Sequence, residues 1–220
     1  MRVTDRGHFS GFSSGYYAIL DCPGWDGRGD EPALLERAAR LLAARPCVLQ
    51  VRAKVASARA LAVLARALLP MARAARVPLC VNDRIDVALA VGAEAVHLGQ
   101  DDVPLAEARA IAAGRLIIGV STHNPQQAAD ADAGGADYLG FGPVFGTITK
   151  ANPDPTVGVD GLRHVVGATR IPVVAIGGVT LANVGQVVAA GASAAAVIGA
   201  IEGSGDTTAA GRAFAAAFDR

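Results

Sequence analysis

A chain of 220 residues is long enough for one domain with a sizeable core and short for two, so a single domain is expected. Its 20 basic and 20 acidic residues balance, which leaves no long-range field to attract nucleic acid or an anionic membrane surface. A hydrophobic fraction of 52% with 18% charged residues is typical of a well-packed soluble protein. Any anionic ligand must therefore be held by local groups rather than by bulk charge.

No apolar run is long enough to cross a bilayer, and residues 1–15 lack the apolar centre of a signal peptide. The three cysteines, Cys22, Cys47 and Cys80, are odd in number and two of them lie in apolar runs. They are expected to be reduced packing residues rather than a disulfide or metal set. These features favour a cytoplasmic protein without nucleic-acid or membrane partners, and they leave a homo-oligomer open. Residues 1–15 form an N-terminal arm for which no structure is predicted.

From Tyr16 onward, short runs rich in Val, Ile and Leu alternate with longer Ala/Leu/Arg segments at helical spacing. Strands are predicted at Tyr16–Leu20, Cys47–Val51, Leu79–Asn82, Ala95–Leu98, Leu116–Val120, Tyr138–Gly142, Val173–Ile176 and Ala194–Ile198. Helices are predicted at Pro32–Ala44, Ser57–Arg76, Arg84–Val91, Leu105–Ala113, Pro125–Ala133, Asp160–Thr169, Leu181–Ala190 and Thr207–Phe218.

The predicted strands are continuous apolar runs, which indicates burial on both faces, as in a parallel sheet flanked by helices. Eight strand–helix units in about 200 residues predict an α/β protein with a single (β/α)8 TIM barrel over residues 16–220. An open doubly wound sheet is the alternative, but no Gly-x-Gly-x-x-Gly follows the first strand. In such barrels the chemistry lies on the loops after the carboxyl ends of the strands.

Two cationic side chains follow the second predicted strand. Strand alternation puts Gln50, Arg52 and Lys54 on one side, without an acidic residue in the same stretch. A pair of cations suits an anion with more than one charge, such as a diphosphate. A strand end that frays into solvent is the alternative.

Carboxylates follow the third and fourth strands. Asn82-Asp83 ends one strand, and Asp101-Asp102 follows the next. Asp83 with Asp102, or with Asp101, would suit one Mg2+ that keeps several waters and binds substrate phosphate oxygens. Helix capping is the alternative, and spacing alone does not separate the two. His97 is interpreted as a strand or core histidine.

Hydroxyl groups and a lysine follow the fifth and sixth strands. Ser121 is near a strand end and is placed to bond a phosphate, whereas His123 is interpreted as a bystander rather than a general base. The loop after a Gly-Pro pair brings Thr147, Thr149 and Lys150 together without an acidic residue beside them. That composition suits an anion site, and a solvated surface loop is the alternative.

Glycines follow the last two strands. Gly177-Gly178 and Ile198-Gly199 let backbone N–H groups approach a ligand closely, and loops seven and eight are the usual phosphate site of this barrel. The strand ends therefore predict two anionic groups at one rim. A reaction that joins a diphosphate ester to a phosphorylated acceptor would use both.

The order and spacing of these motifs resemble the thiamine phosphate synthase family from about Tyr17 to Phe214. The matching motifs are Gln50-x-Arg52-x-Lys54, Asn82-Asp83-Arg84, Val96-His97-Leu98-Gly99-Gln100-x-Asp102, Gly119-Val120-Ser121-Thr122-His123, Gly140-x-Gly142-Pro143-Val144-Phe145-x-Thr147-x-Thr149-Lys150 and Ala175-Ile176-Gly177-Gly178.

This resemblance implies a (β/α)8 barrel that joins 4-amino-2-methyl-5-hydroxymethylpyrimidine diphosphate to 4-methyl-5-(2-hydroxyethyl)thiazole phosphate. The products are thiamine phosphate and diphosphate. It implies that Asp83 and Asp102 bind Mg2+ and that Arg52, Lys54 and Lys150 stabilise the leaving group. Further implied contacts to the pyrimidine diphosphate come from Gln50, Asn82 and Ser121, and contacts to the thiazole phosphate come from Thr147, Thr149, Gly178, Ile198 and Gly199.

Four positions depart from the family's usual pattern. Ala53 stands where Glu is common, and Leu20 stands where a Thr often precedes Asp21. Gly146 replaces a Pro, and Gly199 replaces a Ser whose hydroxyl contacts the thiazole phosphate. The last two bear on affinity for the acceptor more than on the diphosphate half.

Two other functions fit parts of the pattern. One is a thiazole tautomerase, an isomerase on a similar barrel, to which His123 is equally suited. The other is a non-catalytic binder of thiamine precursors. Lys54, Asp83, Asp102 and Lys150 favour the synthase, because an isomerase has no diphosphate to hold.

Overall fold

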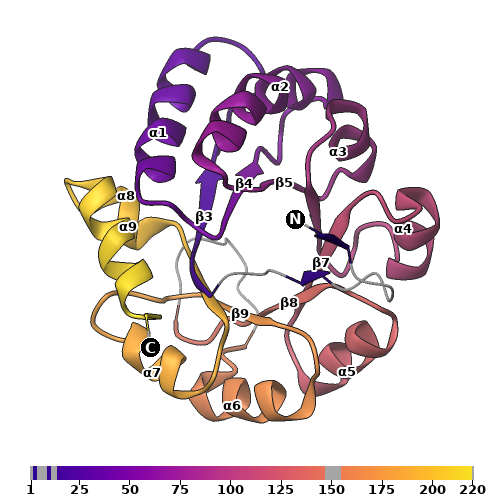
Figure 1. The fold of residues 1–220 in the computed structure, drawn as a ribbon, viewed down its shortest axis with the longest axis vertical. Helices are drawn as coiled ribbons and strands as arrows, with labels where there is room; N and C mark the ends of the chain where they lie inside the picture. Colours follow the sequence, from indigo (N-terminus) through magenta and orange to yellow (C-terminus); the bar gives the residue numbers. More distant parts are fainter. Residues whose placement is uncertain (1, 4–8, 11–13, 147–154, 220) are drawn as a thin grey trace.

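A closed barrel of eight parallel strands forms the body of the molecule (Figure 1). The computed structural model describes residues 2–3, 9–10, 14–146 and 155–219. The barrel strands follow one another in chain order, and the last pairs with the first. They are β3 (Gly15–Asp21), β4 (Val48–Arg52), β5 (Leu79–Asn82), β6 (Ala95–Leu98), β7 (Ile117–Thr122), β8 (Tyr138–Phe141), β9 (Val173–Ile176) and β10 (Ala194–Val197). The predicted (β/α)8 barrel is confirmed.

Helices surround the barrel on its outer side (Figure 1). They are α1 (Glu31–Ala43), α2 (Ala58–Ala75), α3 (Ile85–Val91), α4 (Leu105–Ala112), α5 (Pro125–Ala133), α6 (Gly158–Ala168), α7 (Val184–Ala189), α8 (Gly199–Glu202) and α9 (Thr207–Ala216). The helix α7 begins at Val184 rather than at the predicted Leu181, because the Asn183 side chain accepts from the N–H of Thr180 and stabilises a turn first. The single turn α8 was not predicted.

The N-terminal segment contains a small separate sheet. Strands β1 (Arg2–Val3) and β2 (Phe9–Ser10) pair antiparallel, in the arm for which the sequence predicted no structure. After these two strands, the described residues continue from Ser14, the residue before β3.

Two apolar clusters account for the continuous apolar strands. On β3, Tyr16, Ala18 and Leu20 pack with the helices in the larger cluster. The alternate residues Tyr17 and Ile19 belong to a smaller cluster that consists mostly of strand residues and fills the barrel. Both faces of each strand are therefore buried, which is why the strands show no polar alternation.

The three cysteines lie in these clusters as free, buried thiols, as predicted. Burial is the main cause that raises the pKa of Cys47 to about 12 and that of Cys80 to about 11. Thiols with raised pKa values are poor nucleophiles, so both serve packing. Within the described residues, no helix has the length and apolar character needed to cross a membrane.

Phe214 of α9 tests the packing between the outer helices and the barrel. It is fully buried, and its ring stacks on Tyr16 with 6.3 Å between the ring centroids. Phe214→Ala is expected to lower the free energy of unfolding by about 3–5 kcal/mol, because it leaves a cavity where the helix meets β3. Urea denaturation measures the loss. The control Val63→Ala, at a position 47% exposed on α2, is expected to change stability by less than about 0.5 kcal/mol; equal losses in both variants would contradict this packing.

Candidate active site

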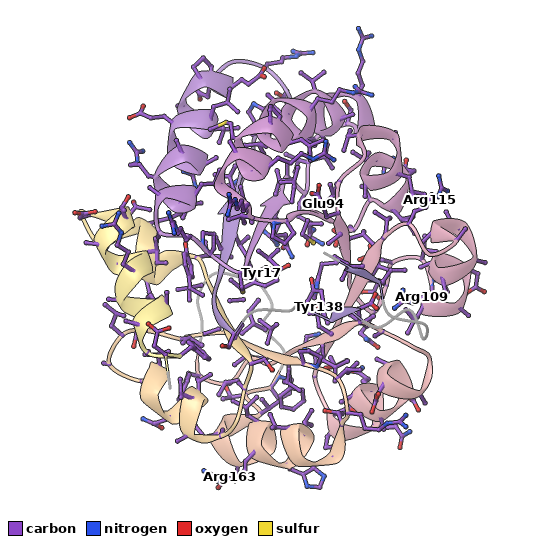
Figure 2. The ribbon with its side chains drawn as sticks, viewed as in Figure 1. Tyr17, Glu94, Arg109, Arg115, Tyr138 and Arg163 are labelled. Carbon is purple, nitrogen blue, oxygen red and sulfur yellow. The ribbon has the colours of Figure 1, made fainter. Side chains whose placement is uncertain are left out.

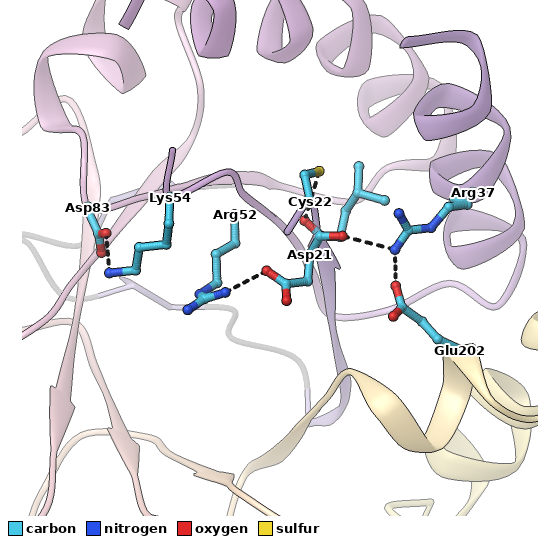
Figure 3. A network of polar contacts seen from close by, with 8 residues as sticks. Asp21, Cys22, Arg37, Arg52, Lys54, Asp83 and Glu202 are labelled. Carbon is cyan, nitrogen blue, oxygen red and sulfur yellow. Dashed lines mark hydrogen bonds and ion pairs between the residues drawn. The ribbon is translucent and has the colours of Figure 1, made fainter. Parts of the chain in front are cut away.

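An ion pair links the carboxyl ends of the first two barrel strands. Asp21 ends β3 and Arg52 ends β4, and the two residues are direct partners in the register. Arg52 Nη1 donates to Asp21 Oδ1 at 2.6 Å, with the two side chains 22% and 10% exposed (Figure 3). Parallel pairing in register therefore fixes the guanidinium at the rim formed by the carboxyl ends of the strands, which we call the carboxyl-end rim.

A second ion pair lies beside the first on the carboxyl-end rim (Figure 3). Lys54 Nζ is 2.7 Å from Asp83 Oδ2, with the lysine more than half exposed and the aspartate largely buried. Asp83 has the left-handed φ of 62°, and its N–H donates to the carbonyl of His97 at 2.8 Å. That turn directs the chain away from the strand before α3 starts, so the carboxylate remains on the rim.

Asp102 joins this group from the loop after β6. Its Oδ2 accepts the N–H of Gly99 at 2.6 Å. Burial raises the pKa of Asp102, and the charge of Asp83 and a hydrogen bond with Asp83 raise it further, against the lowering effects of Gly99 and Lys54. Two carboxyl groups from separate loops are therefore neighbours.

The structure decides against helix capping for Asp83 and Asp102, the alternative that spacing left open. The N-terminal cap positions of α3 and α4 are Arg84 and Pro104, and neither helix has a side-chain cap bond. By contrast, Asn124 does cap α5, by accepting from Gln127 N at 2.9 Å. The two aspartates are thus not needed at the helix ends.

Paired carboxylates are the donor type that Mg2+ takes in proteins, with water and phosphate oxygens completing its coordination. In the described part of the chain, no group of three or more His, Cys, Asp or Glu side chains is placed to hold a metal. Two neighbouring carboxylates, one of which has a pKa raised first by burial and then by the charge of the other, fit an ion that keeps several other ligands. Asp83 and Asp102 are therefore suitable Mg2+ ligands.

A chain of hydrogen bonds crosses the barrel interior and forms the floor of this site. Gln50 Nε2 donates to the hydroxyl of Tyr17 at 2.8 Å, and that hydroxyl lies 2.9 Å from the hydroxyl of Tyr138. The Tyr138 hydroxyl lies 3.0 Å from His97 Nδ1, and His97 Nε2 lies 2.8 Å from Ser121 Oγ. Figure 2 shows Tyr17 and Tyr138 near the centre of the barrel.

This chain includes two functional-site candidates, Gln50 and Ser121, that the sequence had named, and two tyrosines that it had not. Burial raises the pKa of Tyr17 and of Tyr138 well above the ordinary value, so both hydroxyls keep their protons. The sequence could have indicated the two tyrosines, since both stand at inward positions of predicted strands. His97 lies within the barrel, as expected of a strand histidine.

Asn82 is the last residue of β5 and pairs in register with His97, so it lies between the floor and the carboxyl-end rim. His123 lies in the loop after β7, where its Nδ1 is 2.6 Å from the carbonyl oxygen of Gly142. It therefore braces the loops after β7 and β8.

The loops after β8 and β9 are joined by backbone hydrogen bonds. Val144 N donates to Ile176 O at 2.9 Å, and Phe145 N donates to Gly177 O at 3.0 Å. Gly178 has a left-handed φ of 65°, and a Cβ added there would lie 2.4 Å from the carbonyl oxygen of Gly146. A glycine is needed at this position for both reasons. The contact also places Gly178 beside the start of the loop that carries Thr147, Thr149 and Lys150, which themselves lie outside the described residues.

The last predicted contacts are at the end of β10. Gly199 is the first residue of α8, after Ile198 at the cap position. Among the described residues, no atom outside its chain neighbours and the backbone of its own helix lies within 4 Å of the point where its Cβ would stand. The backbone here is accessible, and the space would admit the serine that the family's usual pattern has.

A family model described as thiamine monophosphate synthase matches residues 22–201. The chain belongs to this family. The thiamine-phosphate synthase of Methanocella arvoryzae is 45% identical over 177 residues, which cover 80% of this chain and 84% of that protein. That of Chloroflexus aurantiacus is 51% identical over 138 residues, which cover 63% of this chain and 63% of that protein.

One solved structure agrees with this membership, and a second agrees with the fold. The thiamine phosphate pyrophosphorylase from Pyrococcus furiosus superposes with a TM-score of 0.81 at 33% identity, over 93% of this chain and 95% of that one. A 3-hexulose-6-phosphate synthase superposes with a TM-score of 0.71 at 21% identity and shares the fold.

Asp102→Asn tests the electrostatics of the carboxylate pair. A carboxyl group whose pKa is raised in the folded protein contributes stability while protonated, and this contribution is lost as the pH rises through the raised pKa. Asparagine cannot lose a proton, so the variant is expected to gain stability relative to the parent as the pH rises from about 4 to 7.

Urea unfolding in chelator-containing buffer at several pH values measures this trend. The matched control is Asp101→Asn at the exposed neighbouring position. A stability difference between Asp102→Asn and the parent that stays constant with pH, or that reverses, would contradict the raised pKa of Asp102.

Proposed function

We propose that this protein is a thiamine phosphate synthase that joins the pyrimidine diphosphate to the thiazole phosphate and releases diphosphate. The observation that carries the proposal is the convergence of two cations and three carboxylates, from four separate strand ends, on one rim. Membership in the thiamine monophosphate synthase family supports it.

The reaction needs a good leaving group more than a protein nucleophile. The bond between the pyrimidine methylene carbon and the diphosphate oxygen breaks, and its electron pair leaves with the diphosphate. The thiazole nitrogen then gives its lone pair to that carbon and becomes the positively charged nitrogen of thiamine phosphate. Arg52 and Lys54 stabilise the negative charge that builds on the departing diphosphate.

The ion pairs of the structure suggest how the carboxyl-end rim accepts this anion. Asp21 and Asp83 balance the charges of Arg52 and Lys54, so the cations are held in place before a ligand arrives. The Asp83 and Asp102 side chains would hold Mg2+, which when bound supplies further positive charge to the diphosphate. Lys54, the more exposed cation, would then turn from Asp83 to the diphosphate.

The other named residues orient the two reactants. Gln50, Asn82 and Ser121 would contact the pyrimidine from the floor and the carboxyl-end rim. The loops after β8, β9 and β10 would hold the thiazole phosphate, through the residues that the family resemblance assigns: Thr147, Thr149, Gly178, Ile198 and Gly199. Holding both reactants in line removes much of the entropic part of the barrier. Lys150 would complete the diphosphate site.

The protein would act in the cytoplasm on small molecules. Its three buried thiols are free, which is the state that a reducing compartment maintains.

The direct test mixes both precursors with the protein and Mg2+ and follows thiamine phosphate and diphosphate by chromatography. Both products are expected in equal amounts, and a chelator is expected to stop their formation. A tautomerase would act on a thiazole tautomer without the pyrimidine diphosphate, and a binder would form neither product. Either result would refute the proposal.

Asp83→Asn tests the role of the carboxyl-end rim in turnover. The change removes the charge that would hold the metal but keeps the shape, so kcat/KM is expected to fall by about 100-fold or more. Circular dichroism and thermal melting check that the fold is retained. The matched control is Asp86→Asn on α3, an exposed aspartate that pairs with Arg84. If Asp83→Asn turns over as fast as the control, the metal assignment is wrong.

A further inference from the structure

We propose that Arg37 is a positioning residue that fixes α8, and with it Gly199, relative to Arg52. With Asp21 and Glu202 it forms a polar chain that we call the bridge (Figure 3). The inference rests on the proposed function, because it concerns how the acceptor's phosphate is placed relative to the departing diphosphate.

Arg37 joins three elements through one guanidinium nitrogen. It lies on α1, and its Nη2 donates to the main-chain oxygen of Asp21, the last residue of β3, at 3.0 Å. The same nitrogen forms an ion pair with Glu202, the last residue of α8. One side chain therefore ties the end of the first barrel strand to the turn that follows the last one.

Asp21 extends the bridge to the diphosphate half of the site. Its main-chain oxygen accepts from Arg37, while its carboxylate pairs with Arg52 at 2.6 Å. The Asp21 side chain is only 10% exposed, so its position is defined by packing as well as by these bonds. The polar chain from Arg52 to Glu202 is continuous.

The turn α8 depends on contacts with other elements to keep its position. It has four residues, far too few to be stable without tertiary contacts. Ile201 anchors it by burial in the larger apolar cluster, and Glu202 attaches it to Arg37. Gly199, assigned to the thiazole phosphate, presents only backbone to the ligand. The direction of that backbone is therefore set by how α8 is held.

The other arginine pair on α1 provides the comparison. Arg40 Nη1 lies 2.7 Å from Glu36 Oε1, four residues away on the same helix and largely exposed. That pair connects no separate elements. Removal of the Arg37 side chain therefore changes how α8 is held relative to β3, whereas removal of the Arg40 side chain changes only the surface of α1.

The test compares Arg37→Met, Glu202→Met and the double variant with the control Arg40→Met. Methionine keeps the length and helical preference of each side chain but cannot form the ion pair. The KM for thiazole phosphate is expected to rise by about three- to tenfold in each single variant, while the KM for the pyrimidine diphosphate changes by less than about twofold. The double variant is expected to be no worse than the more affected single variant, because both changes break the same link. Arg40→Met is expected to match the parent.

Three results would overturn the bridge. The first is an unchanged KM for thiazole phosphate in Glu202→Met. This result decides the matter even if Arg37→Met fails to fold. The second is an additive double variant, which would show that Arg37 acts on the ligand directly. The third is an equal rise in both KM values, which would indicate general loosening.

Failure of the proposed function gives a different signal. In that case the parent itself makes no thiamine phosphate. Calorimetric titration of thiazole phosphate into the parent and Glu202→Met then tests the bridge without turnover. Equal dissociation constants, or no binding to the parent, would overturn it.

Discussion

The site depends on the mutual neutralisation of charges on the carboxyl-end rim. Arg52 and Lys54 would repel each other and lose hydration if they were held there alone, and each is instead paired with an aspartate at 2.6 and 2.7 Å, respectively. Such pairs add little to stability when they are partly exposed, so their main consequence is position. The barrel supplies the frame, because eight parallel strands bring all their carboxyl ends to one side.

Beneath these charges, a chain of hydrogen-bonded polar groups crosses a barrel interior that is otherwise largely apolar. Tyr17 and Tyr138 place two hydroxyls in a buried chain that ends at His97 and Ser121. Each of these two hydroxyls has a hydrogen-bond partner, so neither is buried unpaired, and the two side chains are held in single orientations. The floor of the site is consequently held in one arrangement, which would suit the proposed reaction, because that reaction depends on alignment.

Much of the fold and part of the site could be predicted from the sequence, because both follow from local patterns. Continuous apolar strands separated by helices indicate a barrel, and polar residues directly after strands indicate the carboxyl-end rim. What spacing could not decide was whether Asp83 and Asp102 cap helices. That question was answered only by the three-dimensional structure, in which Arg84 and Pro104, rather than the aspartates, stand at the cap positions.

The contacts that the sequence did not reveal join residues far apart in the chain. Arg37 and Glu202 are separated by 165 positions, and neither stands at a predicted strand end. The turn α8 is too short to show a periodic pattern, so nothing in the sequence indicated its contact with α1. Asp21 appeared only as part of a family pattern, and its pairing with Arg52 required the register of two strands.

We propose that this rim binds a departing diphosphate together with Mg2+. Calorimetric titration of inorganic diphosphate with and without Mg2+, into the parent and into Lys54→Met, tests it most directly. The account predicts at least about tenfold tighter binding with Mg2+, and loss of most of that affinity when Lys54 is removed. Equal affinity in the presence and absence of the metal, together with unchanged binding to the variant, would contradict it.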